Sequence, residues 1–321
     1  MEIEASAVPE GVSSEAPVAS EGRRLRVTEK VVLGYFAYAS IAATAFQVAF
    51  NQGLTMAVLN ILTGGVILEF RQRANNKVAS NRGEWLTEVR NWFPALMIVL
   101  AFREAGALCL PDTNYRLDQL FERWDLVLLH SRLVLGILSH GAPWIQHYLE
   151  FCYLLCYPMV PLGFAVLLLG MRSGGLRRRE QQGSGGAGER AIDRFWTTVL
   201  LAALATYALF PFFPSTPPRV LFRDLPGPAV APLLRKLNFW ILGNYGIPSS
   251  VFPSGHVAAV TATALAIRAE LPRLGTVFLV LAASIAAATV YGRYHYTADA
   301  VVGALIATAA FFIARKVHGE S

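Results

Sequence analysis

The sequence predicts an all-α, polytopic membrane protein, built as a bundle of about eight transmembrane helices. Of its 321 residues 54% are hydrophobic and only 16% are charged, whereas soluble domains carry roughly a quarter charged residues. The charges cluster between long runs that are apolar on every side, which is typical of helices surrounded by lipid. The net charge of +6 comes from Arg and Lys beside these runs, a placement that favours membrane topology over nucleic-acid binding.

Eight apolar runs account for the expected spans. Because a helix rises 1.5 Å per residue, about 20 residues cross the hydrocarbon core. The shortest of the eight runs begins at His256, inside a motif described below. The runs cover residues 31–50, 54–70, 92–110, 145–170, 195–213, 256–267, 276–291 and 298–314.

We divide the chain into three parts. Residues 1–22 lack a helical period and are predicted to be a disordered cytoplasmic tail, too long and acidic to begin a secretory signal. Residues 23–144 hold N-terminal spans and an interfacial segment, in which residues 124–138 are expected to form an amphipathic helix. Residues 145–321 form the core that carries the motifs. A Gly- and Ser-rich cytoplasmic connector at residues 183–188 precedes those motifs.

The distribution of basic residues predicts the orientation. With the N-terminus in the cytoplasm and the spans alternating, the cytoplasmic segments hold most of the 28 Lys and Arg residues. Both termini are then cytoplasmic, and the loops after the third, fifth and seventh spans lie outside. The compact topology suits a bacterial inner (plasma) membrane.

Three short stretches fall on that same extracytoplasmic side. Residues 214–219 read Pro-Ser-Thr-Pro-Pro-Arg, residues 252–256 read Phe-Pro-Ser-Gly-His, and residues 291–299 read Tyr-Gly-Arg-Tyr-His-Tyr-Thr-Ala-Asp. If the predicted topology holds, the three stretches meet at one face of the membrane.

The second stretch has the features of an anion site at a helix N-terminus. Free backbone N–H groups and the helix dipole favour a phosphate there. Gly255 allows close approach of the backbone, and the Ser254 hydroxyl adds a donor. His256 then lies beside the anion, where it can protonate a leaving oxygen.

The third stretch supplies a nucleophile. His295 and Asp299 are four residues apart on one helix face. A carboxylate that is hydrogen-bonded to one imidazole nitrogen leaves the other nitrogen free to act as a nucleophile. Arg219 and Arg293 can bind phosphate oxygens through their planar guanidinium groups. These residues suffice for phosphoryl transfer, so no metal or other cofactor is expected.

The Pro-Ser-Gly-His stretch followed by His-x-x-x-Asp resembles the type-2 phosphatidic acid phosphatase (PAP2) superfamily, which also includes vanadium haloperoxidases. The Pro-Pro-Arg and Tyr-Gly-Arg-Tyr-His-Tyr variants are similar to the branch of inositol phosphorylceramide synthases. The resemblance covers roughly residues 145–314 and implies a six-helix-type catalytic core.

The resemblance also implies a role for each motif residue. His295 forms a phosphohistidine, Asp299 orients His295, and His256 protonates the leaving group and then activates the acceptor. The implied phosphate-binding residues are Arg219, Arg293, Ser254 and Gly255. The implied substrate is a lipid phosphate, a polyprenyl pyrophosphate or a phospholipid head group. The acceptor is water in a phosphatase and an alcohol in a phosphotransferase.

The motifs depart from the superfamily pattern in their cations. Phe212 stands where the first motif usually has Lys, and Val220 replaces the Pro that usually follows Arg219. Thr289 occupies the usual Arg position of the third motif, and Arg293 lies closer to the histidine. The missing Lys favours the transferase-like branch. Arg293 has a second interpretation, as an interfacial residue beside neighbouring tyrosines.

Several polar residues remain without an assigned role. Arg103, Glu104, His147 and Glu150 lie in apolar runs, where ionisable side chains are costly and often functional. They are the basis of the alternative interpretation, a non-enzymatic membrane transporter or lipid-binding scaffold. The three cysteines, Cys109, Cys152 and Cys156, form no CxxC pair and are predicted to pack as small apolar residues. The sequence leaves the oligomeric state open.

Overall fold

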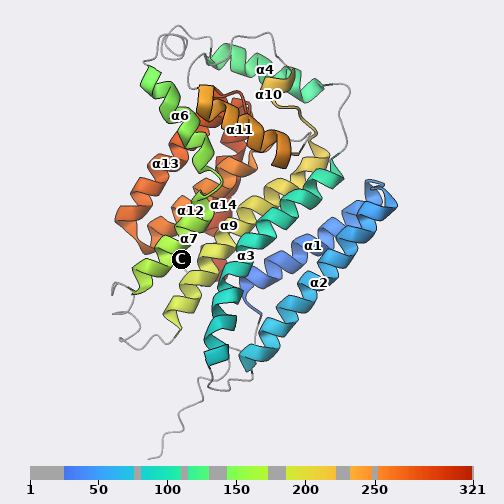
Figure 1. Ribbon diagram of the computed structural model, residues 1–321, viewed down its shortest axis with the longest axis vertical. Helices are drawn as coiled ribbons and strands as arrows, with labels where there is room; N and C mark the ends of the chain where they lie inside the picture. The colour runs from blue at the N-terminus through green and yellow to red at the C-terminus, as the bar shows by residue number, and fades with distance from the viewer. Residues whose placement is uncertain are drawn as a thin grey trace, which may run out of the picture.

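The protein is a helical bundle, seen in a computed structural model that describes residues 25–75, 81–109, 115–129, 143–172, 186–221, 232–247 and 252–319 (Figure 1). No strand occurs in these ranges. The N-terminal helices are α1 (Val27–Ala45), α2 (Phe50–Asn75), α3 (Asn81–Leu108) and α4 (Arg116–Leu129). The middle of the chain forms α6 (Pro143–Leu155), α7 (Met159–Arg172), α9 (Ala187–Leu209) and the 3-10 turn η2 (Phe210–Phe212). The remaining helices are α10 (Pro218–Leu221), α11 (Pro232–Tyr245), α12 (Gly255–Glu270), α13 (Pro272–Tyr291) and α14 (Thr297–Val317).

Helix α9 is the centre of the bundle. It packs against α1 and α3 on one side and against α12 and α14 on the other. Within its most apolar window 72% of the residues are buried, compared with 22% for α2. Two apolar clusters therefore meet on α9, one shared with α1 to α3 and one shared with α7, α12 and α14.

The outer helices present apolar side chains to their surroundings. On α2 the side chains of Phe50, Ile61 and Leu62 are largely exposed, as are Val280 on α13 and Leu305 on α14. A contiguous exposed apolar surface of this kind is unfavourable in water and suits hydrocarbon. Four helices of the described chain are long and apolar enough to cross a membrane, or five if α6 and α7 count as one bent span. The protein is thus a membrane protein.

The described parts of all eight predicted apolar runs are mostly helical, but the count of eight spans is not confirmed. The four clear candidates correspond to α2, α9, α13 and α14. Helices α1, with 19 residues, and α3, with 28, are long enough for a span but are not among the candidates, because charged residues at the start of α1 and within α3 lower their hydropathy. With 16 residues, α12 is shorter than a full crossing.

Two predicted boundaries need correction, and one helix was not predicted. The single run at residues 145–170 is two helices, α6 and α7, bent by 73° at a break that contains Pro158, whose missing N–H interrupts the helix. The amphipathic helix expected at residues 124–138 begins earlier, at Arg116, and its part beyond residue 129 lies outside the described residues. Helix α11 was not predicted, although Leu234, Leu237 and Ile241 follow helical spacing after Pro232. The predicted tail at residues 1–22 lies outside the described chain.

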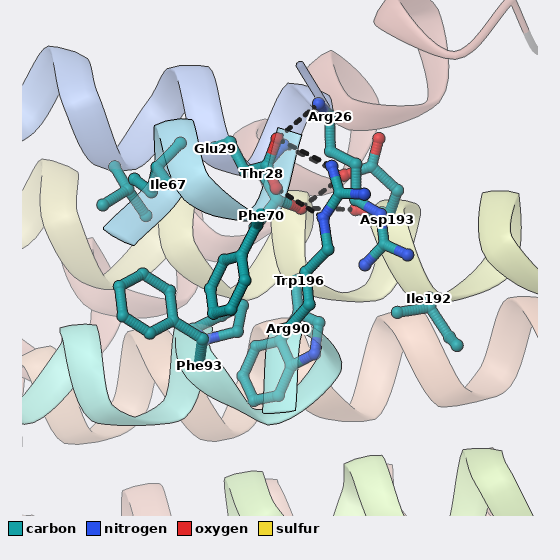
Figure 2. Close-up of a pocket in the computed structure, with 12 residues that line it drawn as sticks. Arg26, Thr28, Glu29, Ile67, Phe70, Arg90, Phe93, Ile192, Asp193 and Trp196 are labelled. Atoms are coloured by element: carbon teal, nitrogen blue, oxygen red, sulfur yellow. Dashed lines mark hydrogen bonds and ion pairs between the residues drawn. The ribbon is translucent and has the colours of Figure 1, made fainter. Parts of the chain in front are cut away.

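A polar cluster fastens α1 to α9 and α3 (Figure 2). The carboxylate of Asp193 on α9 accepts hydrogen bonds from the backbone N–H groups of Val27 and Thr28, each at 3.0 Å. These N–H groups belong to the first turn of α1 and have no partner within that helix. Glu29 forms an ion pair with Arg90 of α3 at 2.7 Å. The start of α1 is therefore anchored by charge as well as by packing.

This polar cluster marks one end of the bundle. His318, just after α14, lies 3.9 Å from the Asp193 carboxylate, so the start of α1, the start of α9 and the end of α14 meet there. The loops that follow α9 and precede α12 and α14 meet at the opposite end, beneath α4 and beside α10 and α11 (Figure 1).

We predict that Asp193→Ala destabilises the bundle. The substitution leaves the backbone N–H groups of Val27 and Thr28 unpaired, the first partly and the second fully buried, and an unpaired buried group costs about 1–3 kcal/mol. The midpoint of thermal unfolding in detergent should fall clearly below that of the wild type. Glu189→Ala, on the same helix, removes an exposed carboxylate 3.9 Å from Arg26 and should change the midpoint little. Equal midpoints for the two variants would contradict the anchoring role.

Candidate active site

The N-terminus of α12 carries the second motif. Ser254 is the N-cap residue, and its hydroxyl oxygen accepts a hydrogen bond from the Val257 amide at 3.3 Å. Gly255 begins the helix against Tyr207, where an added Cβ would lie 2.8 Å from a ring carbon. His256 follows directly. The sequence therefore caps the helix with Ser254 and presents His256 from its first turn.

The N-terminus of α14 carries the third motif. Asp299 is fully buried in the first turn, and one of its carboxylate oxygens lies 3.2 Å from His295 Nδ1 and accepts the Tyr296 amide at 3.0 Å. Because a carboxylate only accepts, His295 holds its proton on Nδ1. The lone pair is then on Nε2, which is the arrangement a nucleophilic histidine requires.

A close backbone contact joins the two helix starts. The Ser254 amide donates to the Asp299 carbonyl oxygen at 3.0 Å. One turn further along α14, Gly303 faces the same junction, and a Cβ added there would lie 2.6 Å from the Ser254 carbonyl oxygen. Glycine at this position therefore allows α14 to approach the N-terminus of α12 closely enough to bring the two histidines together.

The two histidines face one cavity. Their ring centroids are 5.7 Å apart, and both line a cavity of about 640 Å³ together with Gly255 and Arg219. Tyr153 near the end of α6 and Tyr157 in the break that follows it pack their rings against His256. Most of the remaining lining is apolar, and its largest shares come from α3 and α11.

The two predicted arginines differ in position. Arg219 lines the cavity, where its guanidinium donates to the Tyr294 carbonyl oxygen at 3.3 Å and its amide donates to the Arg293 carbonyl oxygen at 3.1 Å. Burial lowers the pKa of Arg219, yet an arginine remains protonated at neutral pH. Arg293 adopts a left-handed backbone conformation with φ of 60°. It does not line the cavity, and it lies within electrostatic range of Asp125 and Glu122 of α4.

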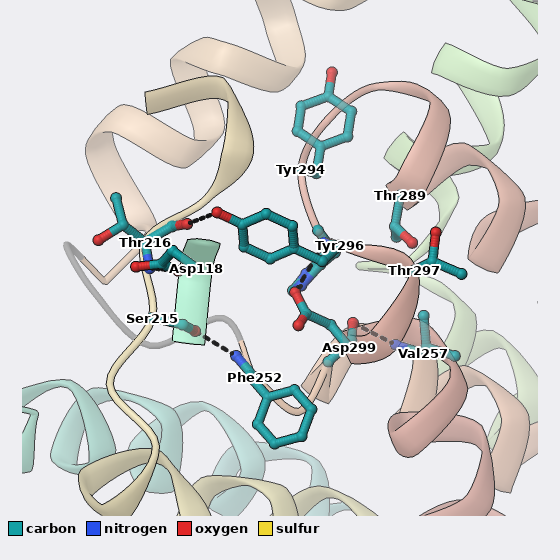
Figure 3. Close-up of polar contacts among 12 residues, drawn as sticks. Asp118, Ser215, Thr216, Phe252, Val257, Thr289, Tyr294, Tyr296, Thr297 and Asp299 are labelled. Carbon is teal, nitrogen blue, oxygen red and sulfur yellow. Dashed lines mark hydrogen bonds and ion pairs between the residues drawn. The ribbon is translucent and has the colours of Figure 1, made fainter. Parts of the chain in front are cut away.

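Helix α4 connects the first and third motifs (Figure 3). Its buried Asp118 accepts the Thr216 amide at 2.9 Å, and the Tyr296 hydroxyl donates to the Thr216 carbonyl at 3.1 Å. Further along α4, Asp125 accepts the Thr297 amide at 3.1 Å. Burial raises the pKa of Asp125, and the bonds from Thr297 oppose that shift. The first motif is also tied to the second, because the Ser215 hydroxyl accepts the Phe252 amide at 3.0 Å.

Glu150 organises the other side of the third motif, a role that the sequence left open. Its buried carboxylate accepts hydrogen bonds from Arg235 at 2.7 Å, from Asn238 at 2.9 Å and from the Tyr294 hydroxyl at 2.7 Å. Burial raises the pKa of Tyr294, so its hydroxyl stays protonated and donates. Tyr294 immediately precedes His295. This network could not be predicted from the sequence, because two of its donors, the Arg235 guanidinium and the Asn238 side-chain amide, come from the unpredicted helix α11.

The other polar residues without an assigned role do not form one cluster. Arg103 lines the cavity, whereas Glu104 is buried on the opposite side of α3, near Asn60 and Tyr35. His147 is exposed on α6, with its Nδ1 atom 2.8 Å from the Pro143 carbonyl oxygen. A single polar pathway through these residues, which a transporter would use, is not seen among the described residues.

Residues 187–313 match the PAP2 superfamily. The match supports the superfamily that the motifs predicted, and with it phosphatase-type chemistry on a lipid phosphate. It takes in α9 to α13 and most of α14, whereas α3, α4, α6 and α7 lie outside it. Comparison with curated proteins and with solved structures gave no match. The resemblance to the inositol phosphorylceramide synthase branch therefore stays a prediction.

We predict that Gly303→Ala disturbs the junction between α12 and α14. The added methyl group meets a backbone oxygen that cannot rotate away, and overpacking of this kind costs about 1–3 kcal/mol. Thermal unfolding in detergent should show a lowered midpoint. Gly65→Ala in α2 is the matched control, because nothing lies within 4 Å of its added Cβ. A Gly303 variant as stable as the control would show that the helices need no such close contact.

We predict that substitutions of Glu150 and Arg235 have strongly coupled effects on the free energy of unfolding. Glu150→Gln leaves a poorly compensated cation in a buried site, which costs about 3–5 kcal/mol. Adding Arg235→Gln removes that cation, so the double variant should lose much less stability than the sum of the single variants. Denaturant unfolding of the four proteins measures the coupling. Glu69→Gln, in an exposed pair with Arg73, should change stability by less than about 1 kcal/mol. Strict additivity at Glu150 and Arg235 would contradict the coupling.

Proposed function

We propose that the protein is an integral-membrane lipid phosphatase or phosphotransferase that acts through a phosphohistidine at His295. The observation that carries the proposal is the pair of histidines, 5.7 Å apart between ring centroids, in one cavity with Arg219. The Asp299 carboxylate behind His295 completes the arrangement. One phosphoryl group can contact both rings at this separation, since reacting atoms approach to about 3–3.5 Å.

Each residue then has a distinct chemical role. His295 Nε2 attacks phosphorus, and Asp299 stabilises the positive charge that develops on the imidazole ring. His256 donates a proton to the leaving oxygen in the first step and removes a proton from the acceptor in the second. The intermediate is a phosphohistidine, which water hydrolyses in a phosphatase and an alcohol consumes in a transferase.

The phosphate oxygens are bound by cationic and backbone donors. Arg219 and the Gly255 amide at the start of α12 are the principal candidates, because both residues line the cavity. Ser254 contributes through the cap that fixes the start of α12, and Arg293, which lies outside the described cavity lining, contributes only at longer range from the neighbouring loop. In this proposal the catalytic residues are His295, Asp299 and His256, and the phosphate-binding residues are Arg219, Arg293, Ser254 and Gly255.

The apolar lining favours an amphiphilic substrate. A head group can reach the histidines while its chain stays beside α3 and α11. The substrate classes consistent with this chemistry are a lipid phosphate, a polyprenyl pyrophosphate and a phospholipid head group. We propose that the site opens on the extracytoplasmic face of a bacterial inner membrane, with both termini in the cytoplasm. Transfer to an inositol-like or sugar alcohol is the alternative to hydrolysis, favoured by Phe212 at the usual lysine position.

Release of inorganic phosphate by the purified protein in detergent tests the proposal. We expect release from phosphatidic acid, a ceramide phosphate or a polyprenyl pyrophosphate, and no release above background from His295→Ala. His256→Ala should slow the reaction roughly 10²- to 10⁴-fold, the usual contribution of a general acid. His147→Ala, which replaces an exposed histidine on α6, should retain wild-type activity.

The possible outcomes are distinct. Release that survives in His295→Ala would refute the proposed nucleophile. Release from none of the three donors by the wild type would rule out the phosphatase and require the assay of phospholipid donors with alcohol acceptors. A His147 variant as inactive as His295→Ala would indicate general disruption of the fold rather than loss of a catalytic group.

A further inference from the structure

The two histidines of the cavity are held in different ways. His295 is hydrogen-bonded to the buried carboxylate of Asp299 at 3.2 Å. Among the described residues, the His256 side chain forms no hydrogen bond or ion pair, and its ring lies instead against the rings of Tyr153 and Tyr157. An imidazole that gives and takes a proton uses its ring nitrogens to do so. Contact between rings can therefore orient His256 without occupying those nitrogens.

The contact of His256 with Tyr153 is the more deeply buried of the two. The ring centroids of Tyr153 and His256 are 6.0 Å apart, and the ring planes are 28° from parallel, as in an offset stack. Tyr157 meets the His256 ring almost at a right angle, with centroids 5.5 Å apart. Only 1% of Tyr153 is exposed, compared with 38% of Tyr157. Because a buried, closely packed side chain keeps its rotamer, Tyr153 is better suited to fix the orientation of His256.

Tyr153 is itself held by the third motif. Its ring stacks on the ring of Tyr294, with centroids 3.7 Å apart and planes 15° from parallel. The Tyr294 hydroxyl donates to the Glu150 carboxylate at 2.7 Å. Glu150 and Tyr153 are three residues apart on α6 and so lie on one face of that helix. This face contacts both Tyr294, the residue before His295, and the ring of His256.

We propose that Tyr153 is a positioning residue for the general acid, because its ring holds the His256 imidazole in the orientation that delivers a proton to the leaving oxygen. The proposal rests on the proposed function and adds to it a residue of α6, a helix outside the region that matches the superfamily.

The orientation of His256 matters in the first chemical step. His295 Nε2 forms a bond to phosphorus, the bond from phosphorus to the leaving oxygen breaks, and that oxygen takes the proton of His256. If the His256 ring were free to rotate, its N–H group would often point away from the leaving oxygen. A misplacement of about 1 Å can slow a reaction roughly 10²-fold. Loss of the Tyr153 ring should therefore slow only those reactions in which the leaving group needs a proton.

Two phosphate esters that carry the same dodecyl chain test the proposal. Dodecyl phosphate has an alkoxide leaving group, which must be protonated as it departs. A dodecyl-substituted nitrophenyl phosphate releases a stable phenolate, which needs no general acid. The quantity to compare is kcat/KM for phosphate release in detergent, because it measures transition-state stabilisation relative to free enzyme and substrate.

We expect Tyr153→Leu to lower kcat/KM roughly ten- to hundredfold with dodecyl phosphate and less than about threefold with the nitrophenyl ester. Tyr153→Phe keeps the ring and should retain most of the wild-type rate with both substrates. His256→Ala should show the same selectivity with a larger loss. Tyr148→Leu, which replaces an exposed tyrosine of α6, should change neither rate.

The nitrophenyl ester also serves as the control for folding. An equal fall with both substrates in Tyr153→Leu would mean a structural role only and would overturn the proposal, as would no fall with either. Tyr153→Phe as slow as Tyr153→Leu would overturn it as well, because the hydroxyl rather than the ring would then matter.

Failure of the proposed function looks different. In that case phosphate release persists in His295→Ala, or His256→Ala slows both substrates equally, and the role of Tyr153 falls with the role of His256. If His256→Ala is selective for dodecyl phosphate and Tyr153→Leu is not, the proposed function stands and only the positioning role of Tyr153 is refuted.

Discussion

The site depends on close contact between the N-termini of helices α12 and α14. The Ser254 amide bonds to the Asp299 carbonyl, and Gly303 leaves the space that this contact requires. Asp299 uses its side chain for His295 and its backbone for Ser254. The orientation of the nucleophile and the position of the helix that carries His256 are thus set by one residue. A small shift of α14 would move both histidines relative to the cavity, which is why the surrounding structure holds this junction from several sides.

Much of that support comes from outside the region that matches the superfamily. Helix α4 holds the first and third motifs through Asp118 and Asp125, and α6 holds Tyr294 through Glu150. The carboxylates on α4 face inward, whereas Trp124 and Val127 on the same helix are exposed. An amphipathic helix with acidic contacts on one face and apolar residues on the other is suited to lie at a membrane interface. In this position α4 can hold the loops of the first and third motifs in place and shield them from water.

The sequence predicted the helical bundle and the motif residues because both depend on local pattern. Apolar runs identify helices by composition alone, and Pro-Ser-Gly-His identifies the start of α12. Contacts between distant segments leave no such pattern. Nothing near Glu150 reveals that Arg235 and Tyr294 bind it, and the short amphipathic α11 was hidden between two more conspicuous motifs. The spacing of Arg293 from His295 predicts a phosphate-binding residue. In the structure the backbone of Arg293 is left-handed, and the residue does not line the cavity. Local spacing cannot reveal such a turn.

The arginines near the site are not equivalent, and their pairing decides the charge of the cavity. Arg235 is bound to Glu150, and Arg293 lies within range of the acids of α4, so neither contributes a full positive charge to the lining. Within the described lining the cations are Arg219 and Arg103, and they come from different sides of the cavity. Buried cations favour anions strongly only when no carboxylate neutralises them. Anion binding at the two histidines should therefore be governed chiefly by Arg219, which is partly buried beside Tyr294, whereas Arg103 is exposed.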